Sequence, residues 1–132
     1  MFTTKDTKAS ADLVFYDIVG AAIEVHRQLG PRLLESAYEA CICRELVLRG
    51  IAFERQVALP LQDRGMRLDC GYRLDLIVAG LVIVEVKSAA KVLPIHRAQV
   101  LTYLKLLKLN LGFIVNFNVE RLRLGLYRIV LS

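Results

Sequence analysis

The amino-acid sequence predicts an α/β domain in which helices pack on a β-sheet. Two helical patterns open the chain, a series of short apolar strands follows, and a third helical pattern precedes the last two strands. The chain has 132 residues, which is enough for one domain with its own hydrophobic core. We therefore expect a single domain over residues 1–132, with residues 1–11 as a flexible N-terminus.

Two N-terminal helices are predicted from apolar residues at helical spacing. The first covers residues 12–29 and ends at Gly30 and Pro31. The second runs from about residue 33 to residue 49, with Gly50 as its C-terminal cap. The apolar positions are Val14, Ile18, Ala22, Val25 and Leu29 in the first helix, and Leu34, Ala37, Cys41 and Leu48 in the second.

Four strands, a helix and two more strands are predicted next, which gives the order α-α-β-β-β-β-α-β-β. The strands are expected at residues 53–60, 66–70, 72–78, 82–87, 111–117 and 125–131. A polar turn at residues 61–65 separates the first two strands. Pro94 suits the first turn of a helix that reaches to about residue 109.

The hairpin over residues 72–88 has a register that its apolar residues select. A two-residue turn at Ala79 and Gly80 would mix charged and apolar side chains on both faces. With one more loop residue, or a bulge near Gly80, one face becomes wholly apolar. This favoured register pairs Val78 with Val82, Leu76 with Val84, and Leu74 with Val86.

The other face of this hairpin then carries like charges opposite each other. Asp75 lies across from Glu85, and Arg73 lies across from Lys87, next to the pair of Ile77 and Ile83. Two unit charges roughly 5 Å apart repel by about 3 kcal/mol at an effective dielectric constant of about 20. A divalent cation between the carboxylates would remove this repulsion, and Lys87 would lie beside it. The simpler alternative is that all three charges are solvated on an open sheet face.

Other polar side chains are candidates for the same site. Glu35 begins the second helix, where it is either a third acidic ligand or a surface acid that favours the helix dipole. In the third helix, His96, Gln99 and Tyr103 form one line that could contact a phosphodiester backbone. A solvated surface row is the alternative. Arg73, Lys91, His96 and Arg97 are the cationic or polar candidates for nucleic-acid binding.

Charge is unevenly divided along the chain, and the basic C-terminal part favours a polyanionic partner. Residues 1–85 have a net charge of minus two, whereas residues 86–132 have a net charge of plus seven. A surface of one sign would steer nucleic acid toward the domain. Many soluble proteins are mildly basic, so this signal is weak by itself.

Several classes of protein are disfavoured by composition. The longest apolar run has nine residues, which is too short to span a bilayer, and the polar N-terminus does not resemble a secretory signal. The three cysteines have no framework or zinc spacing and suit reduced thiols, so we expect a cytoplasmic protein. The 55% apolar share leaves room for a partner surface, such as that of a homodimer.

At this point the sequence resembles the PD-(D/E)XK nuclease superfamily, through Asp75, the Glu85-Val86-Lys87 triplet and Gln99-x-x-x-Tyr103 on the following helix. More narrowly, residues 12–131 resemble the GxxExxY group of small proteins. The matching segments are IVGAAIEVHRQLG, LLESAYE, YRLDLIV, VEVKS, AQVLTYLKLL and GFIVNFNV. There are two departures: Arg32 stands at the glycine position of the group, and Leu74 stands where proline is expected before Asp75.

The resemblance implies a restriction-endonuclease-like core, with a mixed central β-sheet flanked by helices. It implies a Mg²⁺ or Mn²⁺ site formed by Asp75, Glu85 and the main-chain carbonyl of Val86, with Lys87 in the catalytic role. Glu35 would supply a further ligand or support, and Gln99 and Tyr103 would be supporting residues. The implied activity is hydrolysis of DNA phosphodiester bonds by metal-activated water. The alternatives are an inactive nucleic-acid-binding or protein-binding module on the same fold, and an enzyme that acts on another phosphate ester.

Overall fold

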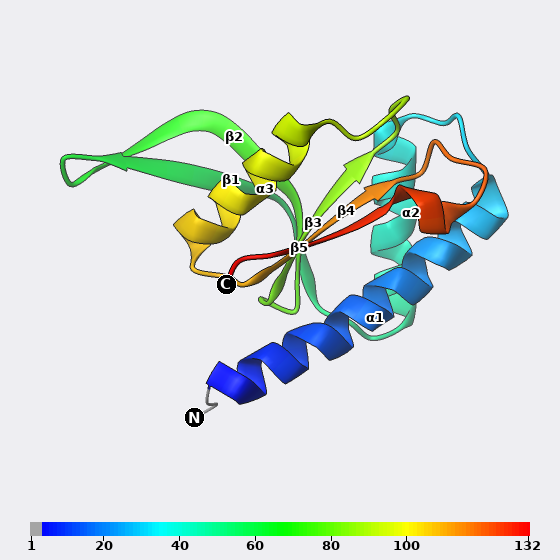
Figure 1. Cartoon of the computed structure of the whole chain (residues 1–132), viewed down its shortest axis with the longest axis horizontal. Helices are drawn as coiled ribbons and strands as arrows, with labels where there is room; N and C mark the ends of the chain where they lie inside the picture. The colour runs from blue at the N-terminus through cyan, green and yellow to red at the C-terminus, as the bar shows by residue number, and fades with distance from the viewer. Residues whose placement is uncertain (1–3) are drawn as a thin grey trace.

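The computed structural model describes the backbone of residues 4–132 and the side chains of residues 10–59, 64–66 and 72–132 (Figure 1). Within these residues the chain forms three α-helices, one short 3-10 helix and a five-stranded sheet with the strand order β1-β2-β3-β4-β5. The elements are α1 (Thr4–Leu29), α2 (Glu35–Leu48), β1 (Phe53–Asp63), β2 (Met66–Val78), β3 (Val82–Lys87), α3 (Pro94–Leu107), β4 (Leu111–Asn116), η1 (Leu122–Gly125) and β5 (Leu126–Val130).

The sheet is mixed, because one of its four strand pairs is parallel. β3 and β4 run parallel, and the connection between them contains α3, as a parallel pair requires a crossover. The β1–β2, β2–β3 and β4–β5 pairs are antiparallel. The prediction of an α/β domain with helices flanking a mixed sheet is therefore confirmed.

Helices cover both faces of the sheet and divide the core into two clusters. α1 and α2 lie against one face, and α3 lies against the other (Figure 1). The α1–α2 cluster contains Ile18, Tyr38, Leu76, Val84, Val86 and Phe113, among others. The α3 cluster contains Leu74, Ile77, Ile83, Val100, Leu104, Ile114 and Ile129. Because both faces are covered, β3 and β4 are buried along almost their whole length.

The strand count between α2 and α3 differs from the prediction. The two strands expected at residues 66–70 and 72–78 are one strand, β2, which pairs with β1 over most of its length. The turn expected at residues 61–65 is confined to Arg64 and Gly65. Gly71 lies between the Ala58–Arg73 and Pro60–Asp69 pairs, where the β1–β2 register shifts, and a glycine inside a strand often marks such an irregularity rather than the end of the strand.

Helix α1 begins earlier than predicted. Residues 4–11 belong to this helix, whereas the apolar pattern predicted its start at residue 12. They are mostly polar and therefore carry no apolar periodicity, yet they contain no glycine or proline that would end a helix. Among the described residues, no helix combines the length and apolar character needed to cross a bilayer.

Candidate active site

The predicted register of the β2–β3 hairpin is confirmed for three residue pairs. Leu76 pairs with Val84, Ile77 with Ile83, and Val78 with Val82, after a turn in which Ala79 and Gly80 have positive φ angles. The regular β2–β3 ladder ends at the Leu76–Val84 pair. Beyond this pair, hydrogen bonds to two carboxylates connect the strands. The Asp75 amide donates to Glu85 Oε1 at 3.2 Å, and the Val86 amide donates to Asp75 Oδ2 at 2.8 Å. Each carboxylate is thus held by a backbone N–H of the other strand.

The β2–β3 ladder ends next to Asp75, and β1 has an unusual backbone conformation opposite the same residue. Gln56 has a φ of 51°, in the left-handed region, and lies between the β1–β2 pairs Arg55–Leu76 and Val57–Leu74. Past this irregularity the side chains of β2 change faces, so Leu74 packs in the α3 cluster.

Two predicted cross-strand pairs are therefore wrong. Leu74 does not pair with Val86, which lies in the α1–α2 cluster on the other face. Arg73 does not pair with Lys87: it is opposite Ala58 of β1, and its guanidinium donates to the Tyr72 carbonyl at 3.0 Å. The predicted ladder pair of Arg73 and Lys87 is therefore not formed, whereas Asp75 and Glu85 remain neighbours through their hydrogen bonds to the opposite strands.

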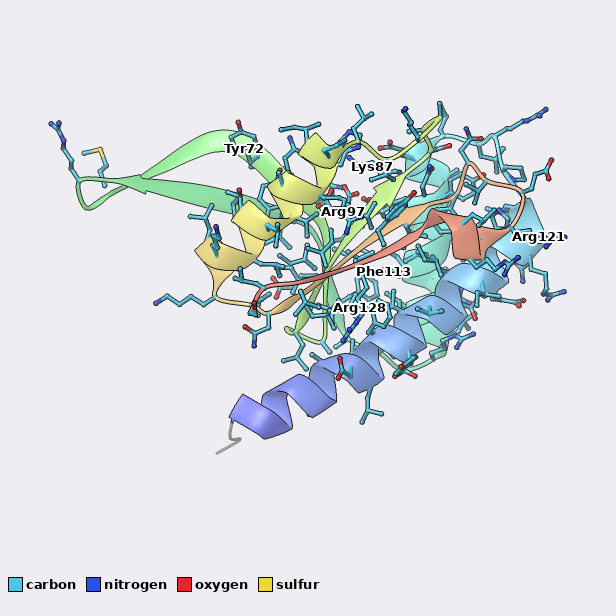
Figure 2. All side chains as sticks on the ribbon, in the orientation of Figure 1. Tyr72, Lys87, Arg97, Phe113, Arg121 and Arg128 are labelled. Atoms are coloured by element: carbon cyan, nitrogen blue, oxygen red, sulfur yellow. The ribbon has the colours of Figure 1, made fainter. Side chains whose placement is uncertain are left out.

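Strand alternation places Glu85 and Lys87 on one face of the sheet. Val84 and Val86 point into the α1–α2 cluster, so Glu85 and Lys87 point to the α3 side with Ile83. Glu85 is 9% exposed, and Lys87 is half-buried near the end of β3 (Figure 2). The site is therefore a partly desolvated acidic pair with one ammonium group beside it.

Burial is the main influence on the protonation of this pair. It raises the pKa of the Glu85 carboxyl to about 8, and the negative charge of Asp75 acts in the same direction. Burial also raises the pKa of Asp75, against the lowering effect of the Val86 N–H. The charge of Lys87 lowers both pKa values by a smaller amount. Without a cation, the pair therefore retains a proton at neutral pH.

A third acid near the pair is Glu39, which the sequence analysis did not identify. Its carboxylate is 6% exposed and accepts hydrogen bonds from Arg55 Nε and Gln56 Nε2, both at 2.7 Å. Gln56 Nε2 also lies 3.4 Å from Asp75 Oδ1, and the charge of Glu39 contributes to the raised pKa of Asp75. The sequence feature that could have identified Glu39 is its position four residues after Glu35, which places both acids on the same side of α2.

Glu35 lies next to the end of β3 rather than in contact with the acidic pair. It is exposed at the start of α2, and its Oε1 accepts from the Ser88 amide at 3.4 Å. Ser88 Oγ donates to the Leu33 carbonyl at 2.6 Å, which ties the residue after Lys87 to the α1–α2 connection. Glu35 thus supports the position of the loop after Lys87.

Tyr38 fixes the α1–α2 connection from inside the core. Its hydroxyl donates to the Gly30 carbonyl at 2.5 Å and accepts from the Leu33 amide at 3.2 Å. Its ring stacks on the Phe117 ring, with 4.4 Å between the ring centroids. Arg32, in the same connection, has a φ of 77°, in the left-handed region where glycine is favoured. Arg32 therefore occupies a conformation that a glycine would adopt without strain.

The predicted line on α3 is only partly directed toward the acidic pair. Gln99 and Tyr103 face a groove between α3 and the β1–β2 hairpin. His96 Nδ1 accepts from the Leu93 amide at 3.0 Å and so helps to begin the helix. The Arg97 guanidinium lies over the Tyr127 ring of β5 at 5.7 Å, and Lys91 is exposed in the loop before α3. Gln99 and Tyr103 therefore share one groove, whereas His96, Arg97 and Lys91 each have different surroundings.

The donors of the acidic pair suit a hard divalent cation. Mg²⁺ is commonly bound by one or two carboxylates, with water and substrate phosphate as its other ligands, and Asp75 and Glu85 supply two adjacent carboxylates. Neutralising the repulsion within a buried pair would favour binding. No group of three or more His, Cys, Asp or Glu residues suited to a metal occurs among the residues that the structure describes. The fit therefore depends on two side chains and on main-chain or solvent oxygen atoms.

Comparison with known proteins identifies the family of the chain. Searches of curated proteins and of solved structures returned no match. A family model described as the PD-(D/E)XK nuclease superfamily matches residues 12–129, which include most of α1, all of α2 and α3, and the sheet except for the last residue of β5. This chain belongs to the PD-(D/E)XK nuclease superfamily and has its restriction-endonuclease-like fold.

Proposed function

We propose that the domain is a nuclease that hydrolyses phosphodiester bonds of DNA with Mg²⁺ or Mn²⁺. The observation that carries this proposal is the interlocked pair of Asp75 and Glu85, held close together by reciprocal backbone hydrogen bonds beside Lys87. A sequence selected for stability alone would avoid two adjacent, largely buried carboxylates. Nucleases of this superfamily typically use divalent metals and act on nucleic acids, which supports the assignment.

Each residue of the pair would have a defined role. Asp75 and Glu85, with the main-chain carbonyl of Val86, would hold the ion. When bound, the ion supplies a Lewis acid and lowers the pKa of a coordinated water. The Glu85 carboxyl must first release its proton, because its pKa is raised to about 8 in the protein without metal. Lys87 would stabilise the negative charge that develops on the phosphate.

Residues around the pair would position the substrate. Glu35 would support the site by holding the Ser88 amide, rather than by joining the carboxylate pair. Gln99 and Tyr103 line the groove next to the site, and we propose that they contact DNA there. Arg73, Lys91, His96 and Arg97 would add contacts or attraction for phosphates.

We also propose the narrower kinship with the GxxExxY group. The positive φ of Arg32 supports it, because a glycine at this position of the group would adopt that conformation without strain. The structural role of Tyr38 supports it as well, since this side chain fixes the connection that precedes Glu35.

A second candidate function is a nucleic-acid-binding or protein-binding accessory module without catalysis. It is favoured by Glu39, the third acid near the pair, because Arg55 and Gln56 already occupy both of its oxygen atoms. A calorimetric titration with Mn²⁺ separates the two functions. Binding that Asp75→Asn abolishes supports the nuclease, whereas DNA binding without Mn²⁺ affinity at millimolar concentrations supports the accessory module.

The proposed nuclease is tested by cleavage of plasmid and single-stranded DNA with Mg²⁺ or Mn²⁺. Asp75→Asn and Lys87→Ala should each lower the cleavage rate by about 100-fold or more, the range for loss of one group that stabilises the transition state. Arg44→Ala, which removes an exposed cation from α2, is the matched control and should leave the rate unchanged. Equal rates in all four proteins would reveal a contaminating nuclease and contradict the proposal.

A further inference from the structure

A groove beside the candidate site has no role in holding a metal. It has a volume of about 240 Å³ and lies between α3 and the β1–β2 hairpin. Its lining residues are Leu59, Tyr72, Gln99, Thr102, Tyr103 and Leu106. This volume is below the range of about 300–1,000 Å³ for sites of drug-sized ligands, and it suits a single planar ring system.

The groove adjoins the acidic pair. Tyr72 lies on β2 three residues before Asp75, in the part of the hairpin that runs beside α3 (Figure 2). Tyr103 packs against the α3 cluster, which includes Leu74, the immediate neighbour of Asp75. Burial raises the pKa of the Tyr103 hydroxyl, and the negative charge of Glu85 raises it further, so the phenol lies within electrostatic reach of the site.

The lining combines aromatic rings with polar groups near the solvent. Tyr72 is 49% exposed, so its ring is available to a ligand, and Leu59 and Leu106 supply aliphatic surface. The Gln99 side chain is exposed and makes no hydrogen bond within the described part of the chain, which leaves its amide free to donate and accept. A nucleobase matches this combination, because it has two apolar faces and a polar edge.

The charge around the groove suits the backbone of the same ligand. α3, which forms one wall of the groove, has no Asp or Glu; its cations are Lys105 and Arg97, and the Arg97 guanidinium lies over the Tyr127 ring of β5. Arg73 follows Tyr72 directly, and its guanidinium lies against the Tyr72 carbonyl. Cations beside aromatic side chains are the usual arrangement for binding single-stranded nucleic acid, since phosphates meet the cations while bases stack on the rings.

We propose that this groove binds one unpaired nucleobase of a DNA strand by stacking on Tyr72 and Tyr103, next to the phosphate at the acidic pair. The inference rests on the proposed function and adds a substrate class to it: single-stranded or locally unpaired DNA. A base inside a duplex is stacked on both faces and paired along its Watson–Crick edge, so it reaches the groove only after it leaves the helix.

The test measures binding in EDTA, where no metal-dependent cleavage can occur. Fluorescence anisotropy compares a thymidine strand of about ten nucleotides, a typical site size for single-strand binding, with an abasic strand of equal length and a blunt duplex. Wild-type protein should bind the thymidine strand about tenfold more tightly than the abasic strand or the duplex. Tyr72→Leu should weaken binding of the thymidine strand by about 5- to 10-fold, at the lower end of the range for loss of one base–aromatic stack, and leave the abasic strand unaffected.

Two further variants separate stacking from a loss of structure. Tyr72→Phe keeps the ring and should bind like wild type, and Tyr16→Leu, which removes a 70% exposed tyrosine from α1, should change nothing. Equal affinity for thymidine and abasic strands, or an equal loss on both in Tyr72→Leu, would overturn the inference. Plasmid cleavage with Mg²⁺ is measured separately. Cleavage without base-dependent binding would refute only the proposal that the groove binds a base. Base-dependent binding without cleavage would refute only the proposed nuclease activity.

Discussion

Replacement of Glu85 by glutamine should make the domain more stable at pH 8 in metal-free buffer. The carboxyl is 9% exposed, and its pKa is raised to about 8, first by burial and then by the charge of Asp75. Glutamine has nearly the same shape, and it removes both the buried charge and the repulsion from Asp75. A residue that helps to hold a metal thus weakens the protein that lacks the metal.

The magnitude follows from the pKa of Glu85. Because the folded pKa is raised from the ordinary value of 4.5 to about 8, the folded state keeps this proton over a range in which the unfolded chain has lost it. Stability is therefore present below pH 4.5 and is lost as the pH rises through about 8. At about 1.4 kcal/mol per pH unit, the free energy of unfolding should fall by about 3 kcal/mol between pH 5 and pH 8.

Urea unfolding in EDTA, followed by far-UV circular dichroism at several pH values from 5 to 8, measures this change. Wild-type protein should lose stability as the pH rises, and Glu85→Gln should show little of this loss and exceed wild type at pH 8. Glu54→Gln, which alters an exposed carboxylate on β1, should keep the wild-type slope. A flat wild-type profile, or a Glu85→Gln variant less stable than wild type at pH 8, would refute the reasoning.

Three further substitutions test the surroundings of the site by urea unfolding. Arg32→Gly should raise the free energy of unfolding by about 0.5–1 kcal/mol, because glycine accepts the positive φ at this position, whereas Arg44→Gly in α2 should lower it by about 1 kcal/mol. Asn116→Ala should lower it by about 2–4 kcal/mol, since this amide is 2% exposed and binds backbone groups of the loops after β3 and β4. Arg55→Ala should lower it by about 1–3 kcal/mol, because the buried Glu39 carboxylate loses its cationic partner; no loss would show that Glu39 is adequately solvated.

The hairpin shows what the sequence could predict about the fold. Apolar side chains alternate along both strands, and only one register places Leu76 and Val78 opposite apolar residues on the same face. The three pairs of the β2–β3 ladder were therefore predicted correctly. The pairing of Leu74 was predicted wrongly, because its side chain packs on the α3 face, opposite to Leu76. Next to this change of face, Gln56 of β1 has a positive φ and contacts Glu39 and Asp75, which are distant in sequence and leave no local pattern.

The same limit applies to the candidate site. The common face of Glu85 and Lys87 follows from strand alternation, and the proximity of Gln99 and Tyr103 follows from helical spacing. Glu39 was missed because its burial is explained only by the packing of α2 against β1. A buried acid has no distinct sequence pattern until its partner is known.

The most direct measurement is anomalous diffraction from a crystal of the full chain soaked in Mn²⁺. The proposed function predicts a manganese peak between the Asp75 and Glu85 carboxylates, on the α3 side of the sheet and near the Lys87 ammonium, and no such peak in Asp75→Asn crystals. Carboxylates on opposite faces of the sheet, or manganese bound only elsewhere, would contradict the assignment of this pair as a metal site.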